Sequence, residues 1–570
     1  MTAAIVCSDL SFSWPDGEPV LSGLTVSFGP GRTGLIGVNG SGKSTLLRLI
    51  AGELRPGSGL VRAGGDVGYL PQAITLGTRR SVSDLLGITA VRDALHAIEA
   101  GHVGEELFAA VGDDWDAEER ARAWLDRLGL RQLGLDDRVE QLSGGETVLV
   151  ALAALFLRRP AIMLLDEPTN NLDLDSRRRL YDAVASWAGV MVIVSHDREL
   201  LGLVDQVPDL SAGTVRLYGG NLAAYEALVA AGHAAAERAV SAAAADVRRE
   251  RRDLVDAQVK QARRDRQGRK VAASGSLPRI VAHARKRHAQ ESAARSGQLH
   301  AERLQAARDR LEDAEQAVRD DAEIRVELPA TAVPAGRTVL TVSGLAGARW
   351  HPAVLAAAVG PARAAAPAPA GWPGRADPSS VAGEVTPPGV LAELVVRGPA
   401  RIALTGPNGA GKTALLRAIA GPTALPTVVV RRRTVVGYLP QRLDILDDSR
   451  TVIENVRSAA SVNEVRASLA RFLFRGERAD RVAGTLSGGE RFRAVLASLL
   501  LAQPSPQLLL LDEPTNDLDL ASVRQLTGAL EGYRGAILVA SHDLPFLRSA
   551  GITRWLRLDR HVGLTVTHPL

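Results

Sequence analysis

The chain has 570 residues, of which 46% are hydrophobic and 23% are charged, so it is long enough for two or more globular domains. It has no uninterrupted apolar run of about 18 residues and no N-terminal secretion pattern, and its one cysteine, Cys7, excludes a disulfide framework or a cysteine-rich zinc site. The net charge is only +4, yet residues 248–310 carry 18 Lys or Arg against seven Asp or Glu. We therefore expect a cytoplasmic protein whose positive charge is concentrated in one segment.

The first informative element is an apolar strand at 33–37, followed by a glycine-rich loop and a helix from residue 45. The loop reads "GVNGSGKS" at 37–44, which in this strand–loop–helix context is typical of phosphate binding, and "GPNGAGKT" at 406–413 repeats it. Backbone N–H groups would surround the phosphates, the loop lysine would reach the terminal ones, and its Ser or Thr neighbour would bind Mg²⁺. A purely structural role for both loops is the weaker alternative. The predicted ATP-binding residues here are Gly37, Asn39, Gly40, Ser41, Gly42, Lys43, Ser44 and Thr45, and Gly406, Asn408, Gly409, Ala410, Gly411, Lys412 and Thr413.

Four further motifs follow each loop in the same order. "GYLPQ" ends at Gln72 and Gln441, each 29 residues after the loop lysine, and "LSGGE" occupies 142–146 and 486–490. An apolar strand then ends in an acidic pair within "MLLDEPTNNLD" (163–173) and "LLLDEPTNDLD" (509–519). A histidine lies 30 residues beyond the first acid of each pair, in "VSHD" and "ASHD". The repetition predicts a duplicated domain.

With these motifs the chain resembles the ATP-binding cassette proteins, and specifically their soluble twin-cassette branch, the ABC-F family. The resemblance implies an α/β fold with two P-loop ATP-binding cassette domains, at 1–220 and 331–570, joined by a long α-helical coiled-coil linker arm at 221–330. It also implies an ATPase that requires ATP and Mg²⁺.

The resemblance assigns roles to the later motifs. Asp166 and Asp512 would hold Mg²⁺, with Ser44, Thr413, Gln72 and Gln441 also at the metal. Glu167 and Glu513 would polarise the attacking water, and His196 and His542 would bind the γ-phosphate. The first residues of each "LSGGE" helix, whose N-terminus attracts phosphate, would complete the site of the opposite cassette: Ser143, Gly144 and Gly145, and Ser487, Gly488 and Gly489. The alternatives are helix caps for the acids and core packing for the histidines.

Three features depart from the family pattern or fit it less firmly. Trp14 fits the aromatic that stacks on adenine, although a tryptophan packed beside an edge strand is the alternative. Leu149 stands where the second copy, "GGERFR", has an arginine, so the two ATP sites are expected to be unequal. An Ala/Pro-rich stretch near 352–390 predicts a loop inserted in the second cassette, where Trp350 is a weak candidate for stacking.

The segment between the cassettes has the apolar spacing of a coiled coil. Val240, Val247 and Leu254 recur every seven residues, and Leu304, Ala307, Leu311, Ala314 and Val318 alternate steps of three and four. We expect a first helix of about 45 residues, some 65 Å long, and a break near Gly268–Arg279 before the second helix.

The tip of this arm, residues 263–287, is strongly basic, and only Asp265 opposes its cations. A solvated helix face is the alternative, but uncompensated cations favour a polyanionic partner such as RNA. The predicted RNA contacts are Arg263, Arg264, Arg266, Arg269, Lys270, Arg279, Arg285, Lys286 and Arg287.

In the ABC-F family such an arm enters the tRNA exit site of the ribosome. The resemblance, closest to antibiotic-resistance ribosomal protection members of actinobacteria, therefore implies a translation factor or a protein that protects the ribosome from a drug. Its partners would be rRNA and the peptidyl-site tRNA, with the chain monomeric, its cassettes paired within one molecule and no stable membrane subunit. One alternative is the ATPase subunit of a multi-component exporter with separate membrane subunits, which leaves the arm unexplained. A DNA-repair ATPase is the other.

Overall fold

The computed structural model describes residues 5–72, 74, 80–211, 213–273, 298–314, 324, 326–345, 390–421, 425, 428–456 and 461–568. The chain forms two compact units. One comprises Met1–Tyr225 with Glu323–Leu570 and contains both cassettes, and the other is the arm, Glu226–Ala322. Within the described ranges, no helix is both long and apolar enough to cross a membrane.

The first cassette is built on a six-stranded sheet of order β5-β6-β7-β3-β8-β9, in which only β9 is antiparallel to its neighbour. Its central strands are continuous apolar runs that are buried along their whole length, as expected for parallel strands covered on both faces. The strands are β3 (Gly31–Leu35), β5 (Val67–Leu70), β6 (Ile162–Asp166), β7 (Val190–Val194), β8 (Gln206–Ser211) and β9 (Thr214–Gly219). Because the carboxyl ends of parallel strands meet at one edge, the loops that leave them gather there.

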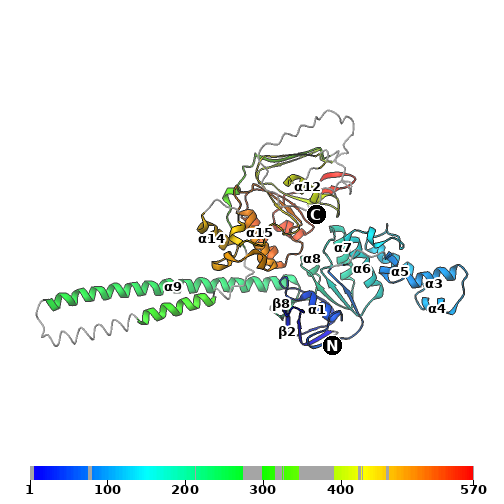
Figure 1. The fold of residues 1–570 in the computed structure, drawn as a ribbon, viewed down its shortest axis with the longest axis horizontal. Helices are drawn as coiled ribbons and strands as arrows, with labels where there is room; N and C mark the ends of the chain where they lie inside the picture. The colour runs from blue at the N-terminus through cyan, green and yellow to red at the C-terminus, as the bar shows by residue number, and fades with distance from the viewer. Residues whose placement is uncertain are drawn as a thin grey trace. The chain divides into compact units, whose positions relative to one another are not determined.

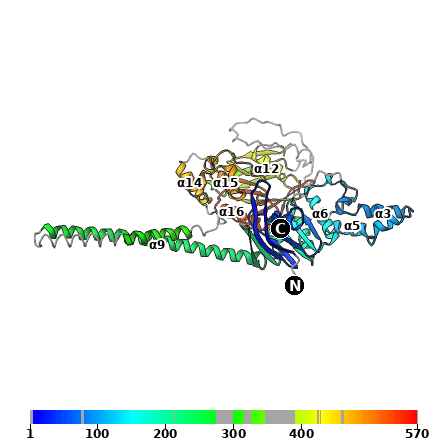
Figure 2. The same cartoon turned by 60° about the horizontal axis from the view of Figure 1, so that its bottom comes forward.

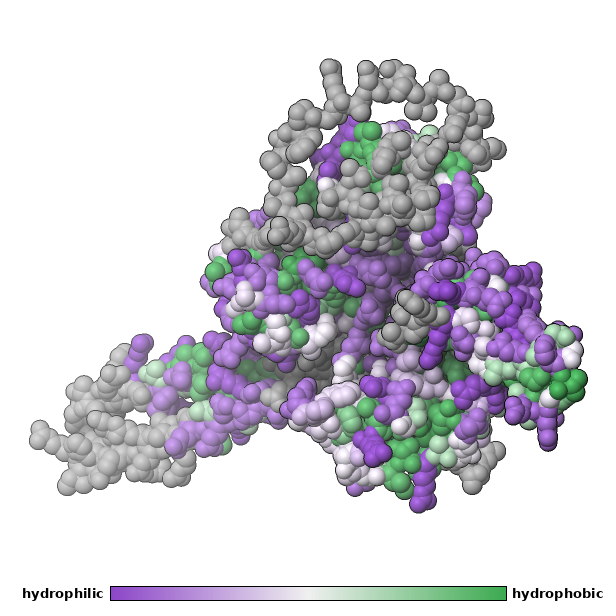
Figure 3. All heavy atoms as spheres, turned by 45° about the vertical axis from the view of Figure 1, so that its right-hand side comes forward, coloured by the Kyte–Doolittle hydropathy of each residue, from purple (hydrophilic) through white to green (hydrophobic). Residues whose placement is uncertain are grey.

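An antiparallel front sheet of order β2-β1-β4 and two groups of helices complete this cassette. Figure 1 shows α3, α4 and α5 beyond the main sheet, whereas α1 and α6 lie close to it. The strands are β1 (Ile5–Ser13), β2 (Pro19–Phe28) and β4 (Ser58–Ala63). The helices are α1 (Lys43–Ile50), α2 (Val82–Leu86), α3 (Thr89–Glu99), α4 (Glu105–Val111), α5 (Ala117–Arg127), α6 (Gly144–Arg158), α7 (Leu174–Ala185) and α8 (Arg198–Leu201). On the face of the molecule drawn in Figure 3, most of the coloured surface is hydrophilic (purple), with hydrophobic patches (green) between.

The second cassette repeats this architecture, which confirms the predicted duplication. Its main sheet has the order β14-β15-β16-β12-β17-β18 and its front sheet the order β11-β10-β13. The strands are β10 (Thr338–Ser343), β11 (Glu393–Arg397), β12 (Arg401–Thr405), β13 (Val429–Arg432), β14 (Val436–Leu439), β15 (Leu508–Asp512), β16 (Ala536–Ala540), β17 (Arg554–Asp559) and β18 (Gly563–Thr567). The helices are α12 (Lys412–Ala420), α13 (Val452–Asn455), α14 (Val462–Arg471), α15 (Gly488–Leu500), α16 (Leu520–Glu531) and α17 (Leu544–Ser549). The predicted insertion, up to residue 389, and Trp350 lie outside the described residues.

The arm contains α9 (Leu222–Ala273), a helix of 52 residues, and a second helix at residues 298–314. Figures 1 and 2 both show the second helix alongside α9, and Arg310 of that helix forms an ion pair with Asp246 of α9. Val240, Val247 and Leu254 are half-buried along α9, and Leu304 and Ala307 are buried on the second helix. The described part of the predicted seam therefore has the expected burial, whereas Val318 lies outside the described residues.

The first helix is longer than predicted. At 1.5 Å per residue, α9 is about 78 Å long rather than 65 Å. It begins directly after β9, where the Asn221 side chain accepts a hydrogen bond from the Ala224 N–H, and it continues through Gly268 to Ala273. A single glycine costs a helix only about 1 kcal/mol, so Gly268 is tolerated within α9. The helix ends at Ala273, within the range predicted for the break, and residues 274–279 of that range lie outside the described residues.

Candidate ATP sites

Each phosphate loop connects a buried strand to a helix whose first residue is the loop lysine. β3 leads to α1, which begins at Lys43, and β12 leads to α12, which begins at Lys412. Gly37 has a φ of 150° and Gly406 one of 137°. A Cβ at Gly37 would meet the Leu210 carbonyl, and one at Gly406 would meet the Leu558 carbonyl, so both positions require glycine.

Both lysines are buried and turned back onto their own loops. Lys43 Nζ donates to the carbonyls of Gly37, at 2.8 Å, and Val38, at 3.0 Å. Lys412 Nζ donates to the carbonyl of Gly406, at 2.8 Å. Burial lowers the pKa of both ammonium groups, and nearby carboxylates, chiefly Glu167 and Glu513, oppose that effect. A buried cation held mainly by carbonyl oxygens suits a phosphate ligand.

The hydroxyl group next to each lysine binds the first acid of the strand-end pair. Ser44 Oγ donates to Asp166 Oδ1 and Thr413 Oγ1 donates to Asp512 Oδ1, both at 3.1 Å. Burial raises the pKa of both aspartates. A hydroxyl and a carboxylate together fit Mg²⁺, which prefers oxygen ligands and shares them with phosphates. The described residues contain no group of three or more His, Cys, Asp or Glu that could hold a metal alone.

A tyrosine that the sequence analysis missed also contacts each of these aspartates. Tyr69 OH donates to Asp166 Oδ2 at 3.4 Å, and Tyr438 OH donates to Asp512 Oδ2 at 3.1 Å. Both tyrosines belong to the repeated "GYLPQ" motif, so their identical spacing before the glutamine was the available signal.

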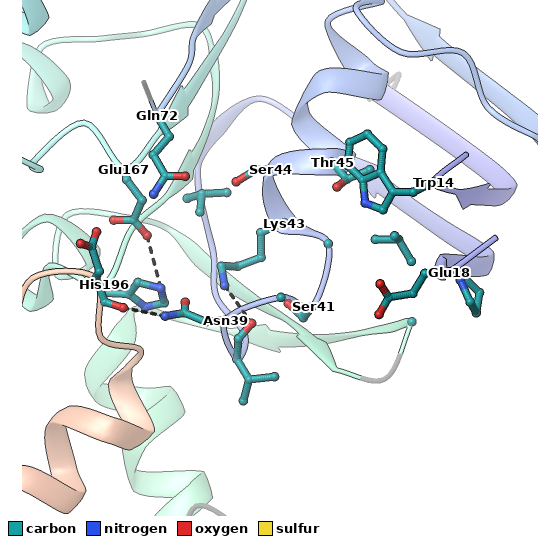
Figure 4. A pocket seen from close by; sticks show the side chains of 18 of the residues that line it. Trp14, Glu18, Asn39, Ser41, Lys43, Ser44, Thr45, Gln72, Glu167 and His196 are labelled. Carbon is teal, nitrogen blue, oxygen red and sulfur yellow. Dashed lines mark hydrogen bonds and ion pairs between the residues drawn. The ribbon is translucent and has the colours of Figure 1, made fainter. Parts of the chain in front are cut away.

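The second acid of each pair faces a histidine. His196 Nε2 lies 3.3 Å from Glu167 Oε1, and His542 Nε2 lies 3.3 Å from Glu513 Oε1 (Figure 4 shows the first pair). Burial raises the pKa of Glu167 to about 8 and also raises that of Glu513. Burial lowers the pKa of His196 to about 3, and that of His542 well below its usual value. Both histidines are therefore neutral near pH 7.

The backbone at both glutamates is strained. Glu167 has a φ of 48° and Glu513 one of 45°, in the left-handed region that residues other than glycine seldom adopt. The N–H of each glutamate donates to the last residue of the neighbouring strand, Val194 or Ala540. These hydrogen bonds to the sheet edge keep the glutamates in the strained conformation. Such backbone strain is common at functional residues.

The first site opens into a cavity of about 860 Å³, which is large enough for a nucleotide. Figure 4 shows Trp14 at one end and Glu167 with His196 at the other, with Lys43 between them. The Trp14 ring is 5.1 Å from the Phe12 ring and 6.0 Å from the Arg48 guanidinium, so it is fixed within the pocket wall. Gln72 also lines the cavity, and both Gln72 and Gln441 are exposed.

Four side-chain polar atoms of site residues are buried without a hydrogen-bond partner. They are Ser41 Oγ and His196 Nδ1 at the first site, and Glu513 Oε2 and His542 Nδ1 at the second site. Unpaired buried polar atoms are costly, so their presence at these positions favours a bound polar ligand.

Residues of both cassettes meet at each phosphate loop. Asn39 Nδ2 donates to the Asp517 carbonyl at 2.6 Å, and Asn408 Nδ2 donates to the Asn171 carbonyl. Asp517 also lines the first cavity. Asn171 and Asp517 each follow the repeated "DEPTN" segment directly, so the two contacts are reciprocal.

The "LSGGE" serines begin α6 and α15, as predicted. Ser143 accepts a hydrogen bond from the Glu146 N–H, and Ser487 accepts one from the Glu490 N–H. A Cβ at Gly488 would lie 4.0 Å from the Asn39 Cβ of the opposite phosphate loop, whereas Gly145 faces the Asn171 carbonyl of its own cassette. Leu149 and its counterpart Arg493 are both buried in their helices, and the Arg493 guanidinium lies 5.8 Å from the Phe474 ring.

The predicted RNA contacts are only partly described. Arg263, Arg264 and Arg266 are exposed on α9. The backbones of Arg269 and Lys270 belong to the same helix. Arg279, Arg285, Lys286 and Arg287 lie outside the described residues.

Comparisons with known proteins give a consistent picture. A family model described as "ABC transporter" matches residues 21–170 and 393–516. The tylosin resistance ATP-binding protein TlrC of Streptomyces fradiae is 33% identical over 557 residues, which cover 93% of this chain and 92% of that protein. The energy-dependent translational throttle protein EttA of Escherichia coli K12 is 29% identical over 564 residues, which cover 94% of this chain and 88% of that protein.

Among solved structures, the archaeal ribosome recycling factor aABCE1, in complex with the ribosomal stalk protein aP1, matches with a TM-score of 0.50 and 19% identity. The match covers 96% of this chain and 87% of that one. At this identity, the match supports the twin-cassette fold alone.

Proposed function

The chain belongs to the ABC-F family of twin-cassette ATP-binding proteins, and on that premise we propose that it hydrolyses ATP at two sites shared between its cassettes and uses this cycle on the ribosome. The observation that carries the ATPase proposal is that both cassettes hold the same arrangement at matching distances. The lysine lies on its loop carbonyl at 2.8 Å, the hydroxyl on the aspartate at 3.1 Å, and the histidine on the glutamate at 3.3 Å.

We assign the binding roles as follows. Lys43 and Lys412 exchange their carbonyl partners for the terminal phosphates, and Trp14 stacks on the adenine of the first nucleotide. Ser44 with Asp166, and Thr413 with Asp512, hold Mg²⁺, assisted by Gln72 and Gln441. When bound, Mg²⁺ neutralises negative charge on the phosphates. The serines and glycines that begin α6 and α15 complete the site of the opposite cassette.

The chemical step falls to the glutamate–histidine pair. Glu167 and Glu513, as carboxylates, accept a hydrogen bond from the attacking water and orient it, and the burial that raises their pKa values makes each ionised carboxylate a stronger base. His196 and His542, which burial keeps neutral with one N–H each, exchange the glutamate for the γ-phosphate and donate that N–H to it. Phosphoryl transfer depends mainly on positioning and charge neutralisation, and these residues supply both.

Two observations support the ribosome as the partner. The relatives named for translational throttling and tylosin resistance match almost the whole chain, arm included. The arm also presents exposed cations at Arg263, Arg264 and Arg266, which suit contact with the RNA backbone. Because the tylosin-resistance relative has the higher identity, we propose protection of the ribosome from an antibiotic as the more specific function. We expect a cytoplasmic monomer that contacts rRNA and the peptidyl-site tRNA.

The test is the double substitution Glu167→Gln with Glu513→Gln. Each glutamine keeps the shape of the side chain but cannot take up a proton, so ATP should still bind while turnover falls at least about 100-fold. The variant should then pellet with ribosomes in ATP more strongly than the parent and should inhibit cell-free translation.

Glu18→Gln is the matched control, because Glu18 lines the same cavity at its Trp14 end. Its turnover should stay within twofold of the parent. A double variant that hydrolyses ATP at the parental rate would overturn the catalytic assignment. Parent protein that sediments with membranes and not with ribosomes would instead support the exporter alternative.

A further inference from the structure

The first cassette contains a buried arginine that the second cassette lacks. Arg177, in α7, is 8% exposed. The repeated segments "DEPTNNLDLDSR" (166–177) and "DEPTNDLDLASV" (512–523) place Val523 at the matching position of α16. The helices begin alike, because Asp173 caps α7 through the Ser176 N–H and Asp519 caps α16 through the Ser522 N–H. The difference at this position is therefore chemical rather than a shift in register.

The guanidinium of Arg177 joins two loops of its own cassette. Its Nε donates to the Leu172 carbonyl at 3.2 Å, and its Nη1 donates to Asp197 Oδ2 at 3.2 Å. Tyr181 OH donates to the same carboxylate oxygen at 2.7 Å. The other oxygen, Asp197 Oδ1, accepts from the N–H groups of Glu199 and Leu200 at the start of α8. Every contact is polar, short and largely buried, so the two loops are held in a fixed relation.

The Asp197 loop belongs to the first ATP site, and the Leu172 loop contributes to both sites. Asp197 follows His196, which lines the first cavity. Leu172 follows Asn171, whose carbonyl accepts a hydrogen bond from Asn408 in the second phosphate loop. The positive charge of Arg177 also acts on Lys412, Glu513 and His542. A continuous chain of contacts therefore leads from His196 through Arg177 to the second site.

The second cassette cannot form the corresponding chain of contacts from its own histidine to the first site. Val523 is buried in the apolar core of the second cassette and has no polar side-chain atom to offer. Asp543, the counterpart of Asp197, accepts a hydrogen bond from the Phe546 N–H at the start of α17. Resting on the proposed function of both pockets as ATP sites, we propose that Arg177 is a positioning residue that couples nucleotide binding at the two sites through Asp197 and Leu172.

The test measures nucleotide release in the hydrolysis-deficient Glu167→Gln, Glu513→Gln chain, with the fluorescent probe mant-ATP and Mg²⁺. The release phase that Lys43→Ala removes belongs to the first site. Disabling the second site by Lys412→Ala should speed that phase at least about fivefold, the lower end of typical coupling between sites. With Arg177→Val added, Lys412→Ala should change the phase less than twofold.

Arg178→Val is the matched control, since Arg178 is the exposed neighbour on the same helix. It should leave the fivefold effect intact. Arg177→Lys keeps the charge but cannot bond both partners at once, so it should give an intermediate effect. Arg177→Val with Asp197→Asn removes the uncompensated carboxylate and should fold and behave as Arg177→Val does.

Full coupling in the Arg177→Val and Arg177→Val, Asp197→Asn chains would overturn the proposal, as would a parent chain that binds mant-ATP at both sites without coupling. Absence of mant-ATP binding at either site of the parent would instead overturn the proposed ATPase function, and this inference with it.

Discussion

Lys43 and Lys412 are buried cations whose charge is balanced only in part by the protein. Each donates to backbone carbonyls, and Lys412 Nζ also lies 2.8 Å from His542 Nε2. Burial lowers the pKa of both lysines, because the charged form loses hydration. A phosphate that replaced the carbonyls would restore the missing negative charge. The two lysines thus favour a negatively charged ligand such as a nucleotide.

Burial of a single residue, Cys7, should also make the stability of the protein depend on pH. It lies in β1 with no exposed surface, and burial raises the pKa of its thiol to about 11. Since the unfolded thiol ionises near pH 9, its contribution to stability should be lost as the pH rises from about 9 to 11. Relative to Cys7→Ala, the free energy of unfolding of the parent should fall by up to about 2–3 kcal/mol over that interval, measured by urea denaturation.

A thiol reagent provides the control for this prediction. It should label the native chain slowly at pH 8 and the urea-unfolded chain at once. Rapid labelling of the native chain would show that Cys7 is accessible, and the predicted pH dependence would then have no basis.

At the scale of elements, α9 combines a narrow apolar seam with a polar exterior. Its half-buried positions follow the heptad spacing of a two-helix coiled coil, and its exposed positions include the cations Arg248, Arg263 and Arg264. The seam stabilises the pair of helices, whereas the outward cations contribute little to folding. Their chemistry is therefore available for a partner.

We expect Arg263→Ala, Arg264→Ala and Arg266→Ala together to weaken ribosome binding and to lower the slope of log K against log salt concentration by about two. The measurement is ribosome pelleting over a salt series. The matched control replaces Arg248, Arg251 and Arg252, exposed cations nearer the start of the same helix, and should have a smaller effect. Equal losses in both variants would mean that the arm acts as a general positive charge.

At the scale of the whole molecule, the two ATP sites share one plan and differ in detail. The second has the contact between Lys412 and His542, and it also lies within reach of the charge of Arg177. The first lies opposite a cassette with valine at position 523. Substitution of Leu149 for arginine in α6 adds a further inequality, although both side chains at that position are buried.

Single substitutions should reveal this inequality. We expect Glu167→Gln and Glu513→Gln, made separately, to leave residual ATPase rates that differ at least about threefold, measured by phosphate release. Growth inhibition on expression should differ in the same order. Equal residual rates and equal inhibition would show that these differences do not affect turnover.

Local motifs allowed much of the sites to be predicted. The sequence places Lys43, Asp166 and Glu167 at or just after the ends of buried strands. Because the carboxyl ends of parallel strands meet at one edge of a sheet, such residues are expected to lie close together. The contact between Asn39 and Asp517 joins residues 478 apart and leaves no local pattern. The burial of Arg177 could not be predicted from the sequence for another reason. Three consecutive arginines, Arg177 to Arg179, are typical of a solvated helix face, and only the packing in the structure shows that Arg177 is buried.

The reciprocal asparagine contacts, Asn39 with Asp517 and Asn408 with Asn171, have a consequence for inheritance. Each contact joins the two halves of the chain, and each acceptor is a backbone carbonyl, so the contacts do not depend on which residue stands at 171 or 517. A recombinant that took one half from a diverged relative should therefore keep both contacts as long as it kept the two asparagines.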